Sequence, residues 1–238
     1  MSDFHWVVLL RVCFPDIIAA ADCRFPALEG ADIWRFCPSQ RLTDDNRPQF
    51  ASDVWAGMAA FDTEADARAF RADPYSQLPF LNTADTVWTA LAIPFAHRGT
   101  VIWRDRIETD CALRVCRDPV EGTLAVVTSA GFDDDSTVPI SRRQDFARGV
   151  DAVLRGYGEA PGNIYRDTVN GAGVDGRDGI TLSLWETDAA MMAAAYKPGV
   201  HRGLMDGHFA DAMFDRSSFS RFRVQDMSED WGRAAAPA

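Results

Sequence analysis

The chain has 238 residues, 47% of them hydrophobic and 25% charged, which is typical of soluble globular proteins and excludes a disordered chain. Lys and Arg total 24 against 35 Asp and Glu, so the formal charge is -11 and nucleic acid is excluded as a partner, because phosphate contacts need a basic surface. No apolar run reaches the roughly 18 residues that cross a bilayer, and we expect a cytoplasmic protein.

The sequence contains no G-x-S-x-G, P-loop or H-E-x-x-H motif, so these motifs identify no catalytic residue. The glycine cluster Gly171-Ala172-Gly173 with Gly176 lies between two predicted strands, where a hairpin loop explains it better than a phosphate-binding loop, which needs a following helix. The cysteines are five in number, scattered and without a C-x-x-C pair, which favours buried free thiols over disulfide bonds or a zinc site.

The first half of the chain alternates strand and helix signals. Apolar and β-branched runs predict strands at Phe4–Cys13, Ala31–Cys37, Val54–Phe61 and Val87–Pro94, with a short extended piece at Gly99–Trp103. A mixed apolar stripe predicts a short helix over Asp16–Leu28. Thr63-Glu64-Ala65-Asp66 forms a capping box that predicts a helix running to about Ala72.

The second half repeats this plan. Strands are predicted at Thr123–Phe132, Asn163–Val169, Ile180–Trp185 and Phe219–Val224. Ser141-Arg142-Arg143-Gln144 looks like a capping box, with apolar residues at helical spacing behind it. The segment V-W-A-G-M-A-A-F-D-T-E-A-D-A-R-A-F aligns with I-T-L-S-L-W-E-T-D-A-A-M-M-A-A-A-Y, a strand followed by a capped helix in both.

The repeat predicts an α+β fold. Each half has the order β-α-β-β-α-β, so we expect two tandem ferredoxin-like units that form a dimeric α+β barrel-like domain with an apolar interior. The predicted halves are residues 1–110 and 111–231, with a frayed tail at 232–238 and one compact unit overall.

Two of the four histidines lie on one predicted helix face after Pro198-Gly199. His201, Leu204, Met205 and His208 follow helical spacing. Seven residues span about 10.5 Å, so the two imidazoles cannot bind one metal ion together. One imidazole on an apolar face suits a flat hydrophobic cofactor such as haem. The alternative is a histidine that caps a helix or is satisfied within the core.

The other two histidines give weaker signals. His5 lies in the first predicted strand, where a hydrogen-bonded core histidine is the favoured interpretation. His97 and Arg98 follow the fourth strand, where they are either solvated or hold an anion at the mouth of a pocket.

Most of the chain resembles the spheroidene monooxygenase family of carotenoid biosynthesis. The similarity lies in the order and spacing of several pieces, which are D-I-W-R-F-C-P-S, V-W-A-G-M-A-A-F-D-T-E-A-D-A, I-T-L-S-L-W-E-T-D-A-A-M-M-A-A-A-Y, K-P-G-V-H-R-G-L and S-F-S-R-F-R-V. The family's expected fold, a duplicated ferredoxin-like or dimeric α+β barrel, agrees with the repeat.

The resemblance implies a haem-dependent monooxygenase that inserts oxygen from O2 into a hydrophobic substrate, with electrons from a ferredoxin-type donor. It implies that His201 is the axial iron ligand and that Arg98 and Arg35 are candidates for the haem propionates. A homo-oligomer is a further expectation. The alternatives are haem-dependent N–O bond chemistry of the aldoxime dehydratase type and a non-catalytic protein that binds haem or another small molecule, because a fold does not fix a reaction.

Overall fold

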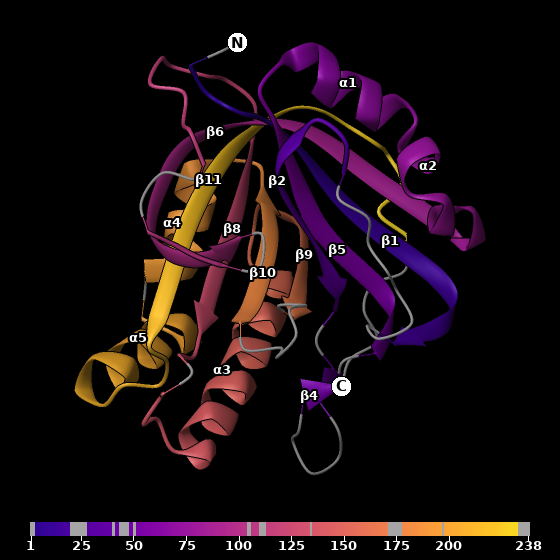
Figure 1. Ribbon diagram of the computed structural model, residues 1–238. Coiled ribbons are helices and arrows are strands. Elements are labelled where there is room, and N and C mark those ends of the chain that lie inside the picture. Colours follow the sequence, from indigo (N-terminus) through magenta and orange to yellow (C-terminus); the bar gives the residue numbers. More distant parts are fainter. Residues whose placement is uncertain are drawn as a thin grey trace.

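The first half of the chain supplies one side of a curled sheet and the helical layer outside it (Figure 1). The computed structural model describes residues 3–19, 28–39, 41–42, 48–49, 51–103, 106–109, 113–133, 135–170, 178–196 and 198–232. The strands of the first half are β1 (Trp6–Ala19), β2 (Ala31–Pro38), β3 (Arg41–Leu42), β4 (Pro48–Gln49), β5 (Ala51–Phe61), β6 (Thr86–Trp103) and β7 (Arg106–Thr109). Its helices are α1 (Glu64–Ala72), α2 (Pro74–Gln77) and the 3-10 helix η2 (Pro79–Thr83).

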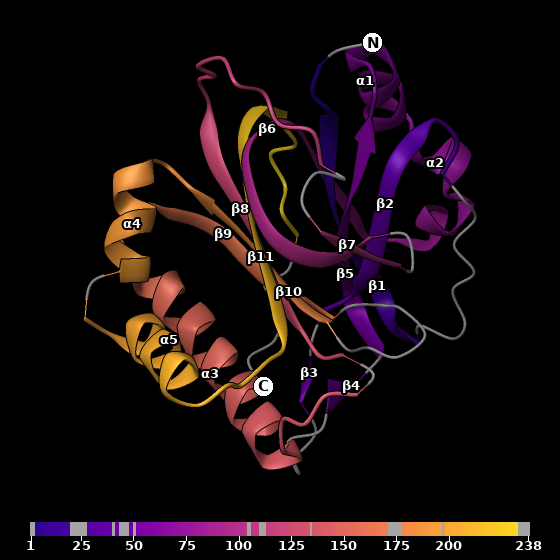
Figure 2. The same cartoon turned by 60° about the vertical axis from the view of Figure 1, so that its left-hand side comes forward.

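The second half has a long helix after its first strand, whereas β1 of the first half continues as strand to Ala19. The strands of the second half are β8 (Thr123–Gly131), β9 (Asn163–Asn170), β10 (Asp178–Trp185) and β11 (Arg216–Met227). Its helices are α3 (Ile140–Glu159), α4 (Asp188–Tyr196) and α5 (Val200–Ala210), which cover the outer face of these strands (Figure 2). Among the residues described, no helix combines the length and the apolar character that crossing a membrane requires.

All pairings in the main sheet are antiparallel, in the order β2-β5-β1-β6-β11-β8-β10-β9, with β7 paired to β6. In each half, the last of the four long strands lies at the centre of the sheet. The first, the third and the second long strand then follow in that order toward the edge. The two halves join along β6 and β11, and the sheet curls until the outer strands β2 and β9 are in contact. The predicted α+β class is confirmed.

Successive side chains along each strand point to opposite faces of the sheet. Apolar side chains on one face form an interior core, and those on the other face form outer cores under the helices. Val7 and Leu9 of β1 face the interior, whereas Val8 and Leu10 face the helices of the first half. The interior core draws side chains from strands of both halves, so neither half could bury it alone. Two smaller cores lie under the helices of the second half.

Several local predictions are wrong, each for an identifiable reason. Asp16–Ala19 continue β1 instead of beginning a helix, because a register shift between Cys13 and Ile18 accommodates Pro15 in the strand. Residues 20–27 of that predicted helix lie outside the described residues. Gly99–Trp103 is the end of the 18-residue strand β6 and not a separate piece. Helix α3 begins at Ile140 after Pro139, so Ser141 lies inside the helix and does not cap it.

The cysteines that the structure describes are buried, as predicted. Cys13, Cys37 and Cys116 lie in the interior and form no disulfide bond with one another. Cys23 and Cys111 lie outside the described residues.

Candidate functional site

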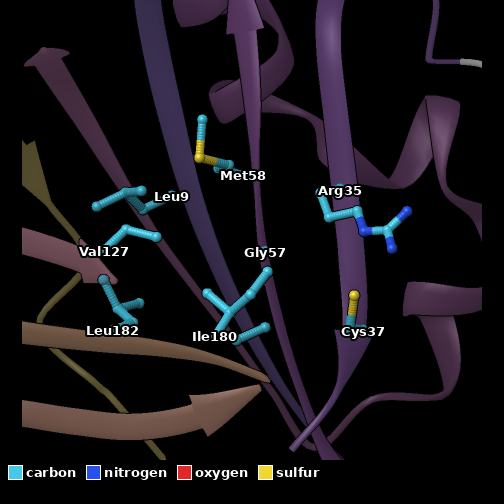
Figure 3. Close-up of a pocket in the computed structure, with 9 residues that line it drawn as sticks. Leu9, Arg35, Cys37, Gly57, Met58, Val127, Ile180 and Leu182 are labelled. Atoms are coloured by element: carbon cyan, nitrogen blue, oxygen red, sulfur yellow. The ribbon is translucent and has the colours of Figure 1, made fainter. Parts of the chain in front are cut away.

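A small cavity lies inside the curled sheet, where the two halves face each other (Figure 3). Five strands line it: β1, β2 and β5 from the first half, and β8 and β10 from the second. The lining residues are Leu9, Arg35, Cys37, Ala56, Gly57, Met58, Val127, Ile180 and Leu182. Since the side chains come from positions more than 170 residues apart, only the folded, curled sheet creates this cavity.

The cavity is narrow and apolar. Its volume is about 20 Å³, room for about one molecule the size of water. No nitrogen or oxygen atom of the lining contributes surface to it. Arg35 is the one charged residue among the nine lining residues, and Figure 3 shows its guanidinium group turned away from the other lining side chains. The site therefore presents carbon and sulfur atoms to whatever occupies it.

A buried ion pair lies next to this cavity. Arg11, two positions after Leu9 on the same face of β1, donates from Nε to Asp167 Oδ2 on β9 at 2.8 Å, and both side chains are at most 2% exposed. Ser39 Oγ donates to the other carboxylate oxygen at 2.9 Å, as does the backbone N–H of Thr168 at 2.8 Å. The pair joins the two halves, and hydrogen bonds offset part of its desolvation cost.

The segment after β11 packs against the same ion pair. The Trp231 carbonyl accepts a hydrogen bond from Arg11 Nη1 at 2.5 Å, and the Arg11 guanidinium lies 4.7 Å from the centroid of the Trp231 ring. This indole stacks on Tyr165 and meets Trp88 edge-on, with ring centroids 4.4 Å and 4.6 Å apart. The Trp231 ring thus covers the Arg11 guanidinium, and Tyr165 and Trp88 pack against that ring.

His201 lies on the opposite side of the sheet, on α5 in the helical layer of the second half. Its Nδ1 donates to the Ala195 carbonyl at 2.6 Å, because a carbonyl oxygen can only accept. The neutral imidazole therefore presents its lone pair at Nε2, the state that a metal ligand requires. Burial lowers the pKa of His201, while the bond to Ala195 opposes this shift, and the neutral form is favoured.

The space around His201 is occupied by side chains. The Tyr157 ring lies 6.0 Å from the imidazole and nearly parallel to it, and the Tyr196 ring lies 6.4 Å away and edge-on. Burial, with a contribution from Tyr196, raises the pKa of the Tyr157 hydroxyl well above its ordinary range. Leu204 packs so closely on α3 that a Cβ at Gly149 would lie 2.5 Å from its Cδ1. As packed here, the residues around His201 do not fit a macrocycle.

The structure does not bring the five sequence-predicted cofactor residues together. His201, Leu204 and Met205 share the half-buried face of α5. Arg98 lies on β6, exposed, with its guanidinium 5.5 Å from the Phe219 ring. Arg35 lines the interior cavity on β2, so the sheet separates it from α5.

The remaining histidines have structural partners. His5 is fully buried and accepts at Nδ1 from the Arg114 backbone N–H, while Nε2 donates to Asp32 at 3.0 Å. The nearby carboxylates of Asp32 and Asp62 would otherwise suit a metal ion, but this bonding places the hydrogen on Nε2 and leaves it no lone pair for a metal. The interpretation of His5 as a hydrogen-bonded core residue agrees with these contacts.

His208 and His97 are also engaged. His208 Nδ1 accepts from the Met213 backbone N–H at 3.1 Å, and its ring stacks on Phe214. His97 Nδ1 lies 2.8 Å from Ser220 Oγ on the neighbouring strand. Of the four histidines, His201 alone is seen to donate from Nδ1 to a carbonyl.

Sequence reasoning missed the ion pair and all of the cavity residues except Arg35. Arg11 carried a usable signal, since it is the single charged residue in the apolar run F-H-W-V-V-L-L-R-V-C. Its partner Asp167 is 156 positions away and carried none. Cys37 and Met58 look like ordinary core residues in the sequence, and only the meeting of the two halves makes them line a cavity.

Comparisons with known proteins find similar solved structures, but they do not assign the chain to a family. No protein-family model matches the chain, and no curated protein matches it. Among solved structures it is similar to a "putative monooxygenase" from Lactobacillus acidophilus, at 9% identity and TM-score 0.40 over 94% of this chain and 96% of that one. It is similar to an anthrone oxidase-like protein at 14% identity and TM-score 0.34, over 99% and 98%.

A third structure matches less than half of the chain. SnoaB, a cofactor-independent oxygenase from Streptomyces nogalater, is 11% identical with a TM-score of 0.34, over 45% of this chain and 98% of that one. Identities and TM-scores this low assign neither a fold family nor a function to the chain.

Proposed function

We propose that the protein is an oxygenase-like enzyme that handles a small apolar reactant inside the barrel. The observation that carries the proposal is the cavity between the two halves, whose lining offers only apolar surface. The oxygenase class comes from the family resemblance of the sequence, and the cavity is compatible with it because apolar reactants partition out of water into such a space.

The chain's own residues would exclude water and fix the shape of the interior. Leu9, Met58 and Leu182 are each at most 3% exposed and form part of the wall. The Arg11–Asp167 pair and Trp231 hold the adjacent part of the barrel together. Preorganised walls of this kind orient a reactant without requiring rearrangement during the reaction.

The experiment that tests the oxygenase proposal follows the oxygen atom. Purified protein is incubated with hydrophobic substrates, including a carotenoid, under 18O-labelled O2 with a ferredoxin-type donor. We expect one labelled oxygen in the product, detected by mass spectrometry. Conversion without label, for example dehydration of an aldoxime, would replace the oxygenase proposal by N–O bond chemistry. Saturable binding without conversion would favour a small-molecule binding protein.

A second candidate is a haem protein with His201 as the axial ligand. It is favoured by one observation, the Nδ1–H bond to Ala195 that leaves a lone pair at Nε2. Because the neighbouring rings fill the space, haem binding would require α5 to move. Reconstitution with hemin is expected to give a Soret band that is lost in His201→Ala and kept in His208→Ala, whose Nδ1 instead accepts from a backbone N–H. No band in the unmodified protein would remove this candidate.

We also propose that the two halves are copies of one ferredoxin-like unit. The support is their identical strand order, β6-β1-β5-β2 in the first half and β11-β8-β10-β9 in the second. The ferredoxin-type donor, the homo-oligomer and the cytoplasmic location remain proposals that rest on the sequence alone.

A further inference from the structure

We propose that the interior cavity is a binding site for molecular oxygen, and not for the organic substrate. The inference rests on the proposed oxygenase function for the identity of the reactant, but its structural argument concerns only the size and the chemistry of the cavity. The cavity holds about one molecule of the size of water and is lined by side chains of both halves.

Water is a poor occupant of this cavity. A buried water molecule is stable where two to four polar groups bond to it. The lining exposes no nitrogen or oxygen atom, and the one charged side chain, Arg35, turns its guanidinium group away. A water molecule placed here would lose its hydrogen bonds, whereas a nonpolar diatomic gas gives up none. The lining therefore selects an apolar guest over the solvent.

The size of the cavity excludes the organic substrate in this conformation. Leu9, Cys37 and Ala56 are fully buried, and Met58 and Leu182 are 3% exposed. Admitting even a small ring would require several of these packed side chains to shift at once, and overpacking a well-packed core is unfavourable. Molecular oxygen is the one apolar reactant of an oxygenase that is small enough to enter without such a shift.

The paramagnetism of O2 allows the test to be made without any organic substrate. Methyl relaxation rates of the full-length protein are measured by NMR under O2 and under N2. We expect preferential enhancement at the methyl groups of Val127 and Leu182, which line the cavity. Leu124 is the internal reference, since it is fully buried on β8 but faces the outer core.

Two matched variants locate the effect. Ala56 and Ala60 lie on the same face of β5, are both fully buried and belong to the same interior core, but Ala56 alone lines the cavity. Ala56→Val is expected to abolish the enhancement at Val127 and Ala60→Val to retain it. Leu182→Ala enlarges the cavity and is expected to increase the enhancement at Val127, which keeps the test decisive if Ala56→Val does not fold.

Equal enhancement at Val127 and Leu124, or an unchanged effect in Ala56→Val, would overturn the proposal. So would a crystal structure with an ordered water in the cavity. The relaxation measurement does not depend on turnover. O2 in the cavity without incorporation of 18O would contradict the oxygenase function and support the O2 site. Incorporation of 18O without O2 in the cavity would support the oxygenase function and contradict the O2 site.

Discussion

Arg11 and Asp167 put opposite charges inside the curled sheet, within hydrogen-bond distance and out of contact with water. Such a pair adds little net stability relative to apolar residues, but loss of one partner leaves a buried charge without compensation. The run F-H-W-V-V-L-L-R-V-C marks Arg11 as a buried charge in the sequence. No local pattern identifies Asp167 as its partner, because the two strands meet only after both halves have folded.

Asp167→Asn is expected to lower the free energy of unfolding by about 3–5 kcal/mol, since the Arg11 guanidinium keeps its charge and loses the carboxylate. Urea denaturation measures the change. The matched control is Asp206→Asn, which removes the partner of Arg202 from a pair on α5 whose members are both 55% exposed. There we expect a loss of about 1 kcal/mol or less. Equal losses in the two variants would contradict a buried, structurally coupled pair.

His5 gives the fold a pH dependence. Burial lowers the pKa of His5 from 6.5, with the charge of Arg114 acting in the same direction and Asp32 opposing both. The unfolded chain therefore binds a proton at a higher pH than the folded one. The stability contributed by neutral His5 is complete above pH 6.5 and is lost as the pH falls from there toward the lower folded pKa.

The expected outcome is a lower urea midpoint at about pH 5.5 than at about pH 7.5 in the unmodified protein, with a smaller difference in His5→Gln. Both proteins are measured at the two pH values under the same salt. His201 and His208 also have lowered pKa values, so some pH dependence should remain in the variant. An unchanged pH dependence in His5→Gln would show that His5 is not the group responsible.

At the scale of the elements, the local sequence predicted the positions of the strands better than the ends of the helices. The apolar and β-branched runs at Ala31–Cys37, Val54–Phe61 and Ile180–Trp185 all became strands, since such residues pack well in a buried sheet. Two similar capping signals had different outcomes. Thr63 caps α1, whereas Pro139 starts α3 before Ser141 and makes that signal irrelevant.

Thr63→Ala is expected to cost about 1 kcal/mol, because its hydroxyl accepts a hydrogen bond from the Asp66 backbone N–H at 3.1 Å in the first turn of α1. Ser141→Ala is the control: Ser141 is exposed inside α3, where alanine is the better helix former, so we expect no loss. Chemical denaturation of both variants distinguishes them. A loss in Ser141→Ala as large as that in Thr63→Ala would mean that Ser141 does cap α3.

At the scale of the whole molecule, the internal repeat of the sequence predicted two similar halves, and the shared strand order is what such a repeat would produce. It could not predict how the halves would fill their common interior. The width of the cavity depends on contacts between residues such as Leu9 and Leu182, which belong to different halves. The spacing of the α5 stripe likewise indicates a buried face, and the packing of that face on α3 could not be predicted from it.

The segment Ser228–Trp231 connects strands of the two halves by hydrogen bonds. Its backbone carbonyls accept hydrogen bonds from Trp88 Nε1 on β6, the Tyr165 hydroxyl on β9 and Arg11 on β1, so it bonds to strands of both halves. Trp231 itself is 8% exposed. A segment held by three strands in this way should contribute to global stability and not only to local order.

Trp231→Ala is therefore expected to lower the free energy of unfolding by about 3–5 kcal/mol, the usual cost of truncating a large aromatic side chain in a core. The variant removes the stacking with Tyr165 and exposes the Arg11–Asp167 pair, so the loss should appear in a single cooperative urea transition. Tyr75→Ala, at a side chain 41% exposed on α2, should change the free energy by about 0.5 kcal/mol or less. If Trp231→Ala matched Tyr75→Ala, the curled sheet would not need this segment for its stability, and the shielding of the ion pair from water would have to come from the sheet alone.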